Sequence, residues 1–389
     1  MLSVRILFFL LAFLPLYVAY VQAQVFRIGI NPKQNYSRVK FSNASSNYII
    51  VGDSSLIGIL TANASCEVVK NSSGNLDVIF EGVRKAGIKN IKLIALQNRG
   101  FVSFTGLSPI TKERSFEGDF SIGLIAGKLK VINEIELEHY LRGVLESEAG
   151  IGQKEEYYKV QAVISRTFAL KEINKHEHEG FNLCNQVHCQ AYLGKGSGVK
   201  SIETAIQKTH KLVLLNTTGN FAPTYFSANC GGQTCDPIQV WNHPIDGIYS
   251  IRDTFCIRTK QAQWTSSIPY SDWKKFFVEK YNFPIDDSLS LSFLNEFQLV
   301  DRTGFYAHPG YGVPMRDLRE RFNLKSSFFS AKLDNGKILL HGRGYGHGVG
   351  LCQEGAMNMV KQHYDFTQIL GFYFPDFRLD FAFNAKILE

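Results

Sequence analysis

The sequence of 389 residues lacks the features of several large protein classes. Its 33 glycines follow no three-residue period, which excludes a collagen-like repeat. Hydrophobic residues make up 45% of the chain, and a chain so rich in them does not stay unfolded. No block of five or more Lys or Arg occurs and the formal net charge is only +7, so nucleic-acid binding has little support. No internal repeat is found.

Several catalytic motifs are absent as well. The G-x-S-x-G, H-E-x-x-H and Walker patterns do not occur. The Gly-rich segment Arg343–Gly350 is not a phosphate loop, because Val349 stands where a dinucleotide-binding frame needs glycine. Alternate glycines let the backbone approach a ligand or another strand closely. His347, which lies between them, therefore has two open interpretations: a residue of a binding site, or a buried residue with a structural role.

A long apolar run occurs once, near the first residue. Arg5 precedes the apolar residues Ile6–Val21, and the small residue Ala23 follows, which predicts a secretory signal peptide over residues 1–23. An uncleaved anchor is the alternative, although the run is short for a bilayer and Pro15 interrupts it. We therefore expect an exported protein of the periplasm or cell envelope, with no stable membrane span after cleavage.

Short alternating segments separated by Gly, Asn and Ser predict strands in the first part of the chain. They are Val25–Ile30, Tyr48–Val51, Leu76–Phe80 and Ile91–Leu96. Residues 24–114 are therefore expected to form a β-rich N-terminal region. Two helices and further strands follow, with a last strand near Ile338–Leu340 and a short helix from Gln353. This arrangement predicts an α+β fold, in which residues 260–330 show little pattern.

The first predicted helix has apolar residues at the spacing of one buried face. They are Leu137, Tyr140, Leu141, Val144 and Leu145. The same spacing leads to Glu148, a carboxylate where an apolar residue is expected. Burying a carboxylate is costly unless it is paired or neutral, so Glu148 is a candidate acid with a raised pKa, whereas Glu146 belongs to the opposite, solvated face. The alternative is that the helix ends near Gly150 and leaves Glu148 on the surface.

Two thiols and two imidazoles occur close together, in the pattern His178-x5-Cys184-x3-His188-Cys189. Two sulfur and two nitrogen ligands can form a tetrahedral site, which suits Zn²⁺. His176 is an alternative ligand. A Cys184–Cys189 disulfide is the other interpretation, because disulfides are common in exported proteins.

Another pair of cysteines frames the segment Cys230–Cys235, which follows a predicted strand ending near Ser227. A tight loop at this point would line a cleft with its amides and polar side chains. A disulfide that closes the loop is an alternative compatible with that interpretation. Because the total of seven Cys is odd, complete pairing leaves one thiol over.

Four ordered segments carry a resemblance to a known family. They are Leu137–Glu148, Lys159–Leu170, Phe226–Gly232 with Val240 and Trp241 after it, and Gly344–Gly350. Together they resemble the SpoIID/LytB family, which contains stage II sporulation protein D and amidase enhancers. The resemblance spans about residues 115–375 and implies a catalytic domain with a central cleft over residues 115–389. Two positions depart from the family pattern: Ala149 and Gly150 replace Met-Pro, and Cys352 replaces Ser.

Sporulation protein D is known as a lytic transglycosylase, so the resemblance implies cleavage of the MurNAc-GlcNAc bond in peptidoglycan glycan strands stripped of their stem peptides. Glu148 matches the catalytic Glu and would act as general acid and then base, which leaves 1,6-anhydro-muramyl ends. No second carboxylate is needed, unlike in ordinary glycosidases. The residues expected to bind substrate are Arg166, Ser227, Gly231, Gly232, Tyr345, His347 and Gln353.

The resemblance also implies a metal, because some members carry zinc on two His and two Cys. The matching residues are His178, Cys184, His188 and Cys189. With four protein ligands, the single expected Zn²⁺ would be structural. Two other functions stay open: a non-catalytic wall-binding module that enhances a partner amidase, and a zinc hydrolase of amide bonds, which would need an open metal position. The expected partners are peptidoglycan glycan strands, with a cell-wall amidase as a further candidate.

Overall fold

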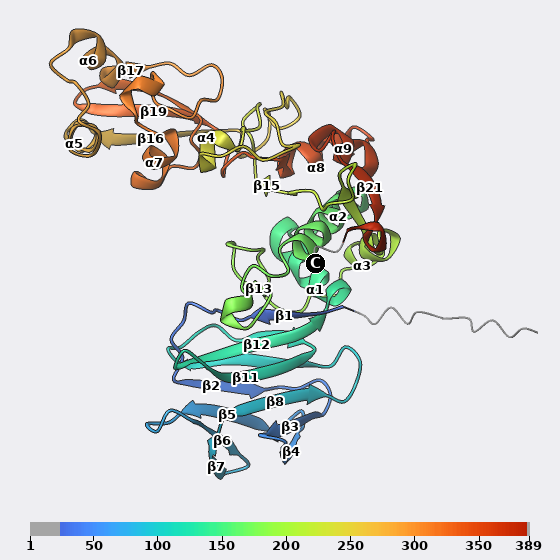
Figure 1. The fold of residues 1–389 in the computed structure, drawn as a ribbon. Coiled ribbons are helices and arrows are strands. Elements are labelled where there is room, and N and C mark those ends of the chain that lie inside the picture. The colour runs from blue at the N-terminus through green and yellow to red at the C-terminus, as the bar shows by residue number, and fades with distance from the viewer. Residues whose placement is uncertain (1–23, 387–389) are drawn as a thin grey trace, which may run out of the picture.

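The computed structural model of the protein describes residues 24–386. Strands dominate the first part of the chain, helices follow, and the remainder mixes both (Figure 1). The predicted α+β class is therefore confirmed. The predicted signal peptide, residues 1–23, lies outside the described residues. Within the described range, no helix combines the length and the apolar character that a bilayer span requires.

The first part of the chain is a sandwich of two sheets. Its strands are β1 Val25–Gly29, β2 Arg38–Ser42, β3 Tyr48–Gly52, β4 Ser55–Leu60, β5 Ser65–Lys70, β6 Leu76–Phe80, β7 Val83–Ile88, β8 Asn90–Ala95, β9 Phe101–Ser108, β10 Arg114–Glu117, β11 Asp119–Ile125, β12 Lys128–Glu136 and, from later in the chain, β13 Leu183–Cys184. One sheet has the order β13-β1-β12-β11-β8-β3-β4 and the other β10-β9-β2-β5-β6-β7. The inner faces meet through aromatic side chains, with the rings of Phe41 and Phe120 5.1 Å apart.

The four predicted strands of this part correspond to β1, β3, β6 and β8. The sandwich continues to Glu136, past residue 114 where the sequence-based boundary was set, because β10, β11 and β12 pair within the same two sheets. The strand β12 leads directly into the first helix, so the sandwich fixes the point at which that helix begins.

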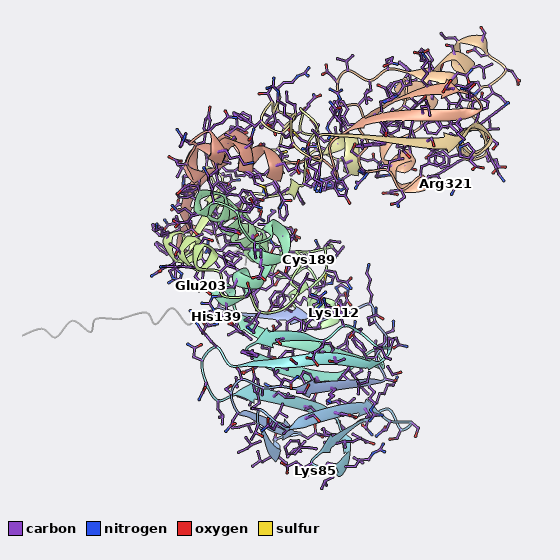
Figure 2. The ribbon with its side chains drawn as sticks, turned by 180° about the vertical axis from the view of Figure 1, so that it is seen from behind. Lys85, Lys112, His139, Cys189, Glu203 and Arg321 are labelled. Atoms are coloured by element: carbon purple, nitrogen blue, oxygen red, sulfur yellow. The ribbon has the colours of Figure 1, made fainter. Side chains whose placement is uncertain are left out.

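Helices α1 Leu137–Ala149, α2 Glu155–Lys171 and α3 Lys200–Lys208 form the middle of the molecule. All five apolar residues predicted for the buried face of α1 are buried. Ion pairs join this layer to the sandwich: Glu117 of β10 contacts His139 and Arg142 of α1, and Arg142 also contacts Glu203 of α3. Figure 2 labels His139 and Glu203 at this junction.

Several short elements complete the helical layer, one of them before α3 and the others after it. They are η1 Glu177–Glu179, which precedes α3, then β14 Leu212–Leu215, β15 Phe226–Ser227, α4 Ile238–Trp241, β20 Leu351–Cys352, α8 Gln353–Lys361, α9 Phe366–Tyr373, β21 Arg378–Phe381 and η3 Ala382–Asn384. The strand β14 pairs antiparallel with β21, and β15 pairs parallel with β20. The second pairing brings residues more than 120 positions apart side by side, which builds one wall of the site described below.

Residues 263–343 form a lobe with its own core. Its elements are β16 Gln263–Pro269, α5 Tyr270–Tyr281, α6 Ser288–Asn295, β17 Glu296–Phe297, η2 Pro309–Tyr311, α7 Met315–Arg321, β18 Phe329–Asp334 and β19 Lys337–Arg343. The four strands pair in the order β16-β19-β18-β17 over an aromatic core that includes Trp273, Phe277 and Tyr306. The lobe stands away from the sandwich, with the helices between them (Figure 1). This segment showed little pattern in the sequence, yet it is folded.

The lobe joins the rest of the protein at a narrow neck. Its first and last residues, Gln263 and Arg343, are paired with each other across β16 and β19. The buried side chain of Arg302 makes a further attachment, because Nε donates to the carbonyl of Gln233 and Nη2 to the carbonyl of Cys230, each at 2.7 Å. Arg316 adds a third contact, to the carbonyl of Val240 at 3.1 Å.

Candidate functional site

Glu148 is the penultimate residue of α1. The helix ends at Gly150, whose φ of 71° is in the left-handed region that favours glycine and whose N–H donates to the carbonyl of Glu146. Glu148 therefore belongs to an ordered last turn and not to a frayed end. Its Oε1 accepts a hydrogen bond from the backbone N–H of Ala191, which ties the carboxylate to a loop 43 residues further along the chain.

Burial controls the acidity of Glu148. Desolvation raises the pKa of its carboxyl above the usual range, and the hydrogen bond from the Ala191 N–H partly opposes this by favouring the charged form. A carboxyl with this environment holds its proton to a higher pH than a solvated glutamate. Such a group can serve as a proton donor and, once ionised, as a base.

Glu148 faces an open cleft of about 620 Å³. Aromatic side chains supply much of its lining, from α2, from β15 and the residue before it, from α4 and from the Gly-rich segment. They are Phe168, Tyr225, Phe226, Trp241 and Tyr345. Flat rings with polar edges suit the faces of a sugar chain as well as its hydroxyls. Among the described residues that line the cleft, Glu148 is the only carboxylate.

The Gly-rich wall, residues Gly344–Gly350, forms the side of the cleft across from α1. Its glycines allow close backbone packing: a Cβ on Gly350 would lie 2.1 Å from the carbonyl oxygen of Tyr225, and Gly350 has a φ of 71°. Tyr345 pairs with Asn229 in a short β-bridge and is 46% exposed. The glycines thus pack backbone on backbone, while Tyr345, Gly346 and His347 line the cleft.

His347 is held in its neutral form. Its Nδ1 accepts the backbone N–H of Val349 at 3.0 Å, so the assigned tautomer carries its proton on Nε2. Burial, with the nearby guanidinium groups of Arg319 and Arg302, lowers the pKa of His347 to about 4. The ring packs beside Trp241 with centroids 5.5 Å apart. At neutral pH this residue lines the cleft as an uncharged imidazole.

Two polar side chains complete the cleft next to Glu148. Gln353, the first residue of α8, donates through Nε2 to the backbone carbonyl of Glu148 at 3.4 Å and to Oε1 of Gln161 at 3.3 Å. Ser227 has a buried Oγ with no hydrogen-bond partner in the structure. A buried hydroxyl without a partner is uncommon, and its position in the cleft lining suits a ligand hydroxyl.

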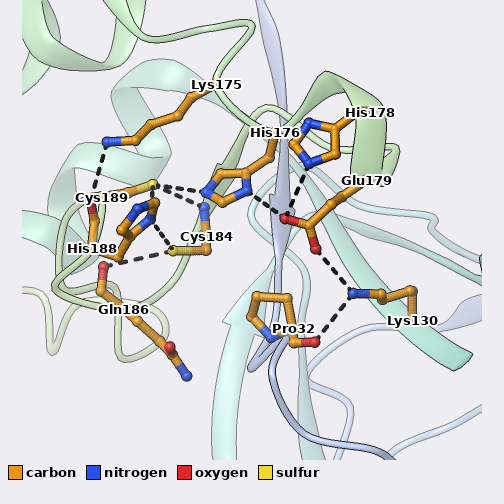
Figure 3. A network of polar contacts seen from close by, with 10 residues as sticks. All are labelled: Pro32, Lys130, Lys175, His176, His178, Glu179, Cys184, Gln186, His188 and Cys189. Atoms are coloured by element: carbon orange, nitrogen blue, oxygen red, sulfur yellow. Dashed lines mark hydrogen bonds and ion pairs between the residues drawn. The ribbon is translucent and has the colours of Figure 1, made fainter.

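A group of thiols and imidazoles lies at the edge of the cleft (Figure 3). It comprises His176, Cys184, His188 and Cys189, whose ligand atoms all lie within 4.8 Å of one another. We call it the cleft-side group, because His188 and Cys189 also line the cleft. His178, expected as a ligand from the sequence, lies outside it and is largely exposed. The 3-10 turn Glu177–Glu179 is the reason, since it points His176 inward and leaves His178 outside.

The cleft-side group fits a zinc ion. Nε2 of His176 lies 3.4 Å from Sγ of Cys189, and Nδ1 of His188 lies 3.8 and 3.9 Å from the two sulfurs. These separations are close to the ~3.5–3.8 Å edges of a tetrahedron with zinc bond lengths. Nδ1 of His176 contacts the carboxylate of Glu179 at 2.7 Å, the outer partner typical of a metal-bound imidazole. The Cys184–Cys189 disulfide is not formed.

Comparisons with known proteins show what the chain is similar to. The sequence profile of the family described as Stage II sporulation protein (SpoIID) matches residues 126–215. Stage II sporulation protein D of Bacillus subtilis is 26% identical over 270 residues, which cover 62% of this chain and 74% of that protein. The Amidase enhancer of B. subtilis is 24% identical over 285 residues, 60% of this chain and 39% of that protein. The chain is thus similar to proteins of the SpoIID/LytB family. An uncharacterised protein of Brachyspira hyodysenteriae is 27% identical over 357 residues, 88% of this chain and 92% of that protein.

The part of the chain that matches the SpoIID profile contains both Glu148 and the cleft-side group. The Gly-rich wall lies outside that match, more than 120 residues beyond its end. The lining of the cleft thus comes both from the region that matches the profile and from a segment distant in sequence.

Three residues expected at the cleft from the sequence lie elsewhere. Arg166 is completely buried, and its guanidinium bonds both carboxylate oxygens of Glu138 at 2.8 and 2.7 Å, so it joins α2 to α1. Gly231 packs against the backbone of Arg343 and Gly344, and neither it nor Gly232 lines the cleft. The Cys230–Cys235 disulfide is not formed, because Sγ of Cys235 faces Gln239.

Several lining residues were not singled out from the sequence. They are Phe168, Lys175, Thr224, Tyr225, Trp241 and His243. Trp241 could have been predicted, because it belongs to one of the segments that carry the family resemblance. Lys175 and His243 stand in loops with no periodic pattern, so nothing in the sequence indicated them.

Proposed function

We propose that this protein is a peptidoglycan lytic transglycosylase that cleaves the MurNAc-GlcNAc bond of glycan strands. Similarity to the SpoIID/LytB family supports a role connected with the cell wall. The reaction itself is our inference from the cleft. Glu148 is the proposed catalytic residue, acting first as acid and then as base.

One observation carries the proposal: a single carboxylate with a raised pKa in an aromatic-lined cleft. Ordinary glycosidases need two carboxylates flanking the bond, either ~5–5.5 Å apart or ~6.5–9.5 Å apart. Glu148 has no second carboxylate beside it among the described lining residues. A reaction in which the sugar supplies its own nucleophile needs only one.

The proposed chemistry balances with Glu148 alone. The protonated carboxyl donates its proton to the glycosidic oxygen as the bond to the MurNAc C1 breaks, and the GlcNAc leaves with a free hydroxyl. The ionised carboxylate then accepts the proton of the MurNAc C6 hydroxyl while that oxygen bonds to C1. The product is a 1,6-anhydro ring, no water is consumed, and Glu148 recovers its proton.

The remaining cleft residues support binding and orientation. Tyr345 and Trp241 offer flat rings for sugar faces, and His347 lines the cleft as an uncharged imidazole. The unpartnered Oγ of Ser227 is suited to a sugar hydroxyl. Gln353 holds the backbone carbonyl of Glu148, which restrains the acid.

Zinc on His176, Cys184, His188 and Cys189 would supply structural cross-linking and no open coordination position. The loop that carries Cys189 continues to Ala191, whose N–H contacts Glu148. The proposed role of the cleft-side group is therefore to hold this loop against the acid. Four protein ligands also disfavour a zinc hydrolase of amide bonds, which needs an open metal position.

A second candidate is a non-catalytic module that binds wall glycan and enhances a partner amidase, suggested by the relative named Amidase enhancer. We further propose that the protein is exported and acts at the periplasm or cell envelope. The basis for this proposal is the signal peptide predicted from the sequence. Its residues lie outside the described part of the chain.

Digestion of purified, peptide-free glycan strands by the purified full chain tests the proposal. Mass spectrometry of the products is expected to find 1,6-anhydro-muramyl ends, lighter by one water than the ends left by hydrolysis. Reducing muramyl ends would contradict the transglycosylase assignment. Uncut glycan, combined with faster cleavage of whole wall by an added amidase, would favour the second candidate.

A further inference from the structure

A second cluster of metal-ligand side chains lies inside the protein, and none of its residues lines the cleft. It consists of Cys230, Asp253, Cys256 and Cys352, and we call it the buried thiol group. Three separate segments supply it: the loop after β15, the turn around Asp253, and the start of α8. All four residues are completely shielded from solvent.

The four ligand atoms converge on one point. They all lie within 4.8 Å of one another. Sγ of Cys230 lies 3.4 Å from Sγ of Cys256 and 3.2 Å from Oδ2 of Asp253. A tetrahedral zinc site with bonds of about 2.0–2.3 Å has ligand separations of roughly 3.5–3.8 Å, so a small outward relaxation would accommodate the ion.

The carboxyl group of Asp253 has no cationic partner among its hydrogen bonds. Its carboxylate accepts the phenol of Tyr373 and the N–H of Phe255, each at 2.9 Å, and the thiol of Cys230. A fully buried carboxylate is costly without a compensating charge. A divalent cation bound between Asp253 and the thiols would provide that charge.

The surroundings resemble an outer shell around a metal site. Sγ of Cys352 accepts two backbone hydrogen bonds, from the N–H of Cys230 at 3.2 Å and from the N–H of Gly355 at 3.3 Å. Such donors stabilise a thiolate, the form of Cys that binds metals. Gly355 also leaves room for the carboxylate, since a Cβ there would lie 2.5 Å from Oδ2 of Asp253.

We propose that Cys230, Asp253, Cys256 and Cys352 bind a second structural Zn²⁺. Three soft sulfur ligands and one oxygen suit zinc better than Ca²⁺ or Mg²⁺, which take oxygen ligands. The ion cross-links the loop after β15 to the start of α8, and both segments adjoin the cleft residues Ser227 and Gln353. The ion would thereby hold in place the two segments that carry Ser227 and Gln353.

A Cys230–Cys256 disulfide is the competing arrangement. A disulfide bond requires about 2.05 Å between the sulfurs, shorter than the observed 3.4 Å, and it would leave the thiol of Cys352 and the carboxylate of Asp253 buried together. Metal binding uses all four side chains, whereas the disulfide uses two.

Elemental analysis of the purified full chain tests the proposal, with zinc present during expression and no chelator afterwards. The expected ratio is two zinc ions per chain for the unmodified protein and one for Cys256→Ser. Cys235→Ser is the matched control, because Cys235 is equally buried, lies close in sequence and faces Gln239 instead of the cluster. It is expected to keep both ions. A zinc ratio that Cys256→Ser leaves unchanged would overturn the second site.

A second measurement leaves the buried thiol group intact. The double variant Cys184→Ser, His188→Ala removes ligands of the cleft-side group and is expected to keep one metal ion. When that ion is replaced by Co²⁺, the sulfur-to-metal absorption should correspond to three thiolates, which the cleft-side group with two cannot supply. A metal-free double variant, or a Cys230–Cys256 disulfide found after unreduced alkylation and digestion, would contradict the proposal. Neither readout depends on glycan cleavage.

Discussion

The two walls of the cleft present different chemistry to a ligand. The wall formed by the end of α1 and the loop to Ala191 carries the ionisable groups: Glu148, with its raised pKa, and the thiols and imidazoles of the cleft-side group. The Gly-rich wall carries close-packed backbone and neutral side chains, such as His347 with its pKa lowered to about 4. In the proposed mechanism, proton transfer takes place at the first wall, and the second wall contributes shape and hydrogen bonds.

The largest expected effect is on the first wall. Glu148→Gln removes the transferable proton while keeping the side chain's size, so glycan cleavage should fall by about 10²–10⁴-fold. The release of anhydro-muramyl ends measures it. Glu146→Gln is the matched control from the same helix turn, because Glu146 bonds Ser197 outside the cleft lining and glutamine keeps one acceptor oxygen. If Glu146→Gln were the inactive variant, the assignment of the acid would be wrong.

The cleft-side group should give the next largest effect. His176→Ala removes a ligand that faces Cys189, so the protein should lose its cleft-side zinc, and cleavage should fall about 10–100-fold as the loop to Ala191 loosens. His178→Ala is the matched control two residues away and should keep both the metal and the activity. Zinc content and cleavage rate are measured on the same samples. If His178→Ala lost zinc instead, His178 would be the metal ligand, as expected from the sequence, and His176 would not.

The pH dependence should report Glu148. Because its pKa is raised, the proton-bearing form persists to higher pH than for a solvated glutamate, and kcat/KM should fall as pH rises through that pKa. Stability should follow the same sign: folding favours the protonated form, so this contribution is lost as pH rises. Glu148→Gln lacks this loss, and its melting temperature at neutral pH should equal or exceed that of the unmodified protein. A clearly lower value would mean that ionised Glu148 stabilises the fold.

A smaller effect is expected on the Gly-rich wall. His347→Asn can keep the acceptor for the N–H of Val349 but removes the Nε2 donor, so cleavage should fall severalfold with little change in melting temperature. His347→Ala should lose both the activity and some stability. If His347→Asn cleaves glycan at the full rate while His347→Ala melts several degrees lower, His347 is a structural residue only.

The smallest effect on cleavage should come from outside both walls. Glu138→Gln weakens the ion pair with the fully buried Arg166 and should lower the free energy of unfolding by about 1–3 kcal/mol. The folded fraction should cleave glycan at the normal rate, as measured below the melting transition. A loss of cleavage without a loss of stability would instead indicate that Arg166 takes part in substrate binding, as expected from the sequence.

The sequence predicted those parts of the site that depend on local periodicity. The apolar stripe of α1 identified Glu148 because a helix repeats its faces every 3.6 residues, and the structure has that helix. The meeting of the Gly-rich wall with β15 was beyond such reasoning, since only the β15–β20 pairing brings those segments together. The alternate glycines predicted a close approach to a ligand or another strand, but not which strand.

Local backbone conformation decided the points at which the predictions differ from the structure. His176 and His178 are two residues apart, and the 3-10 turn between them selects one for the cleft-side group. Arg166 stands in a family motif, but its position on α2 turns it toward Glu138. The lobe was missed because its core is aromatic and its elements are short, so neither helical nor strand periodicity develops over a long enough window.

The attachment of the lobe has a mechanical consequence. Two paired strands at Gln263 and Arg343 would by themselves act as a hinge. Arg302 and Arg316 add hydrogen bonds to the carbonyls of Cys230 and Val240, so the lobe is also held to the segment between these residues. Because Val240 precedes Trp241, a displacement of the lobe would act directly on a residue that lines the cleft.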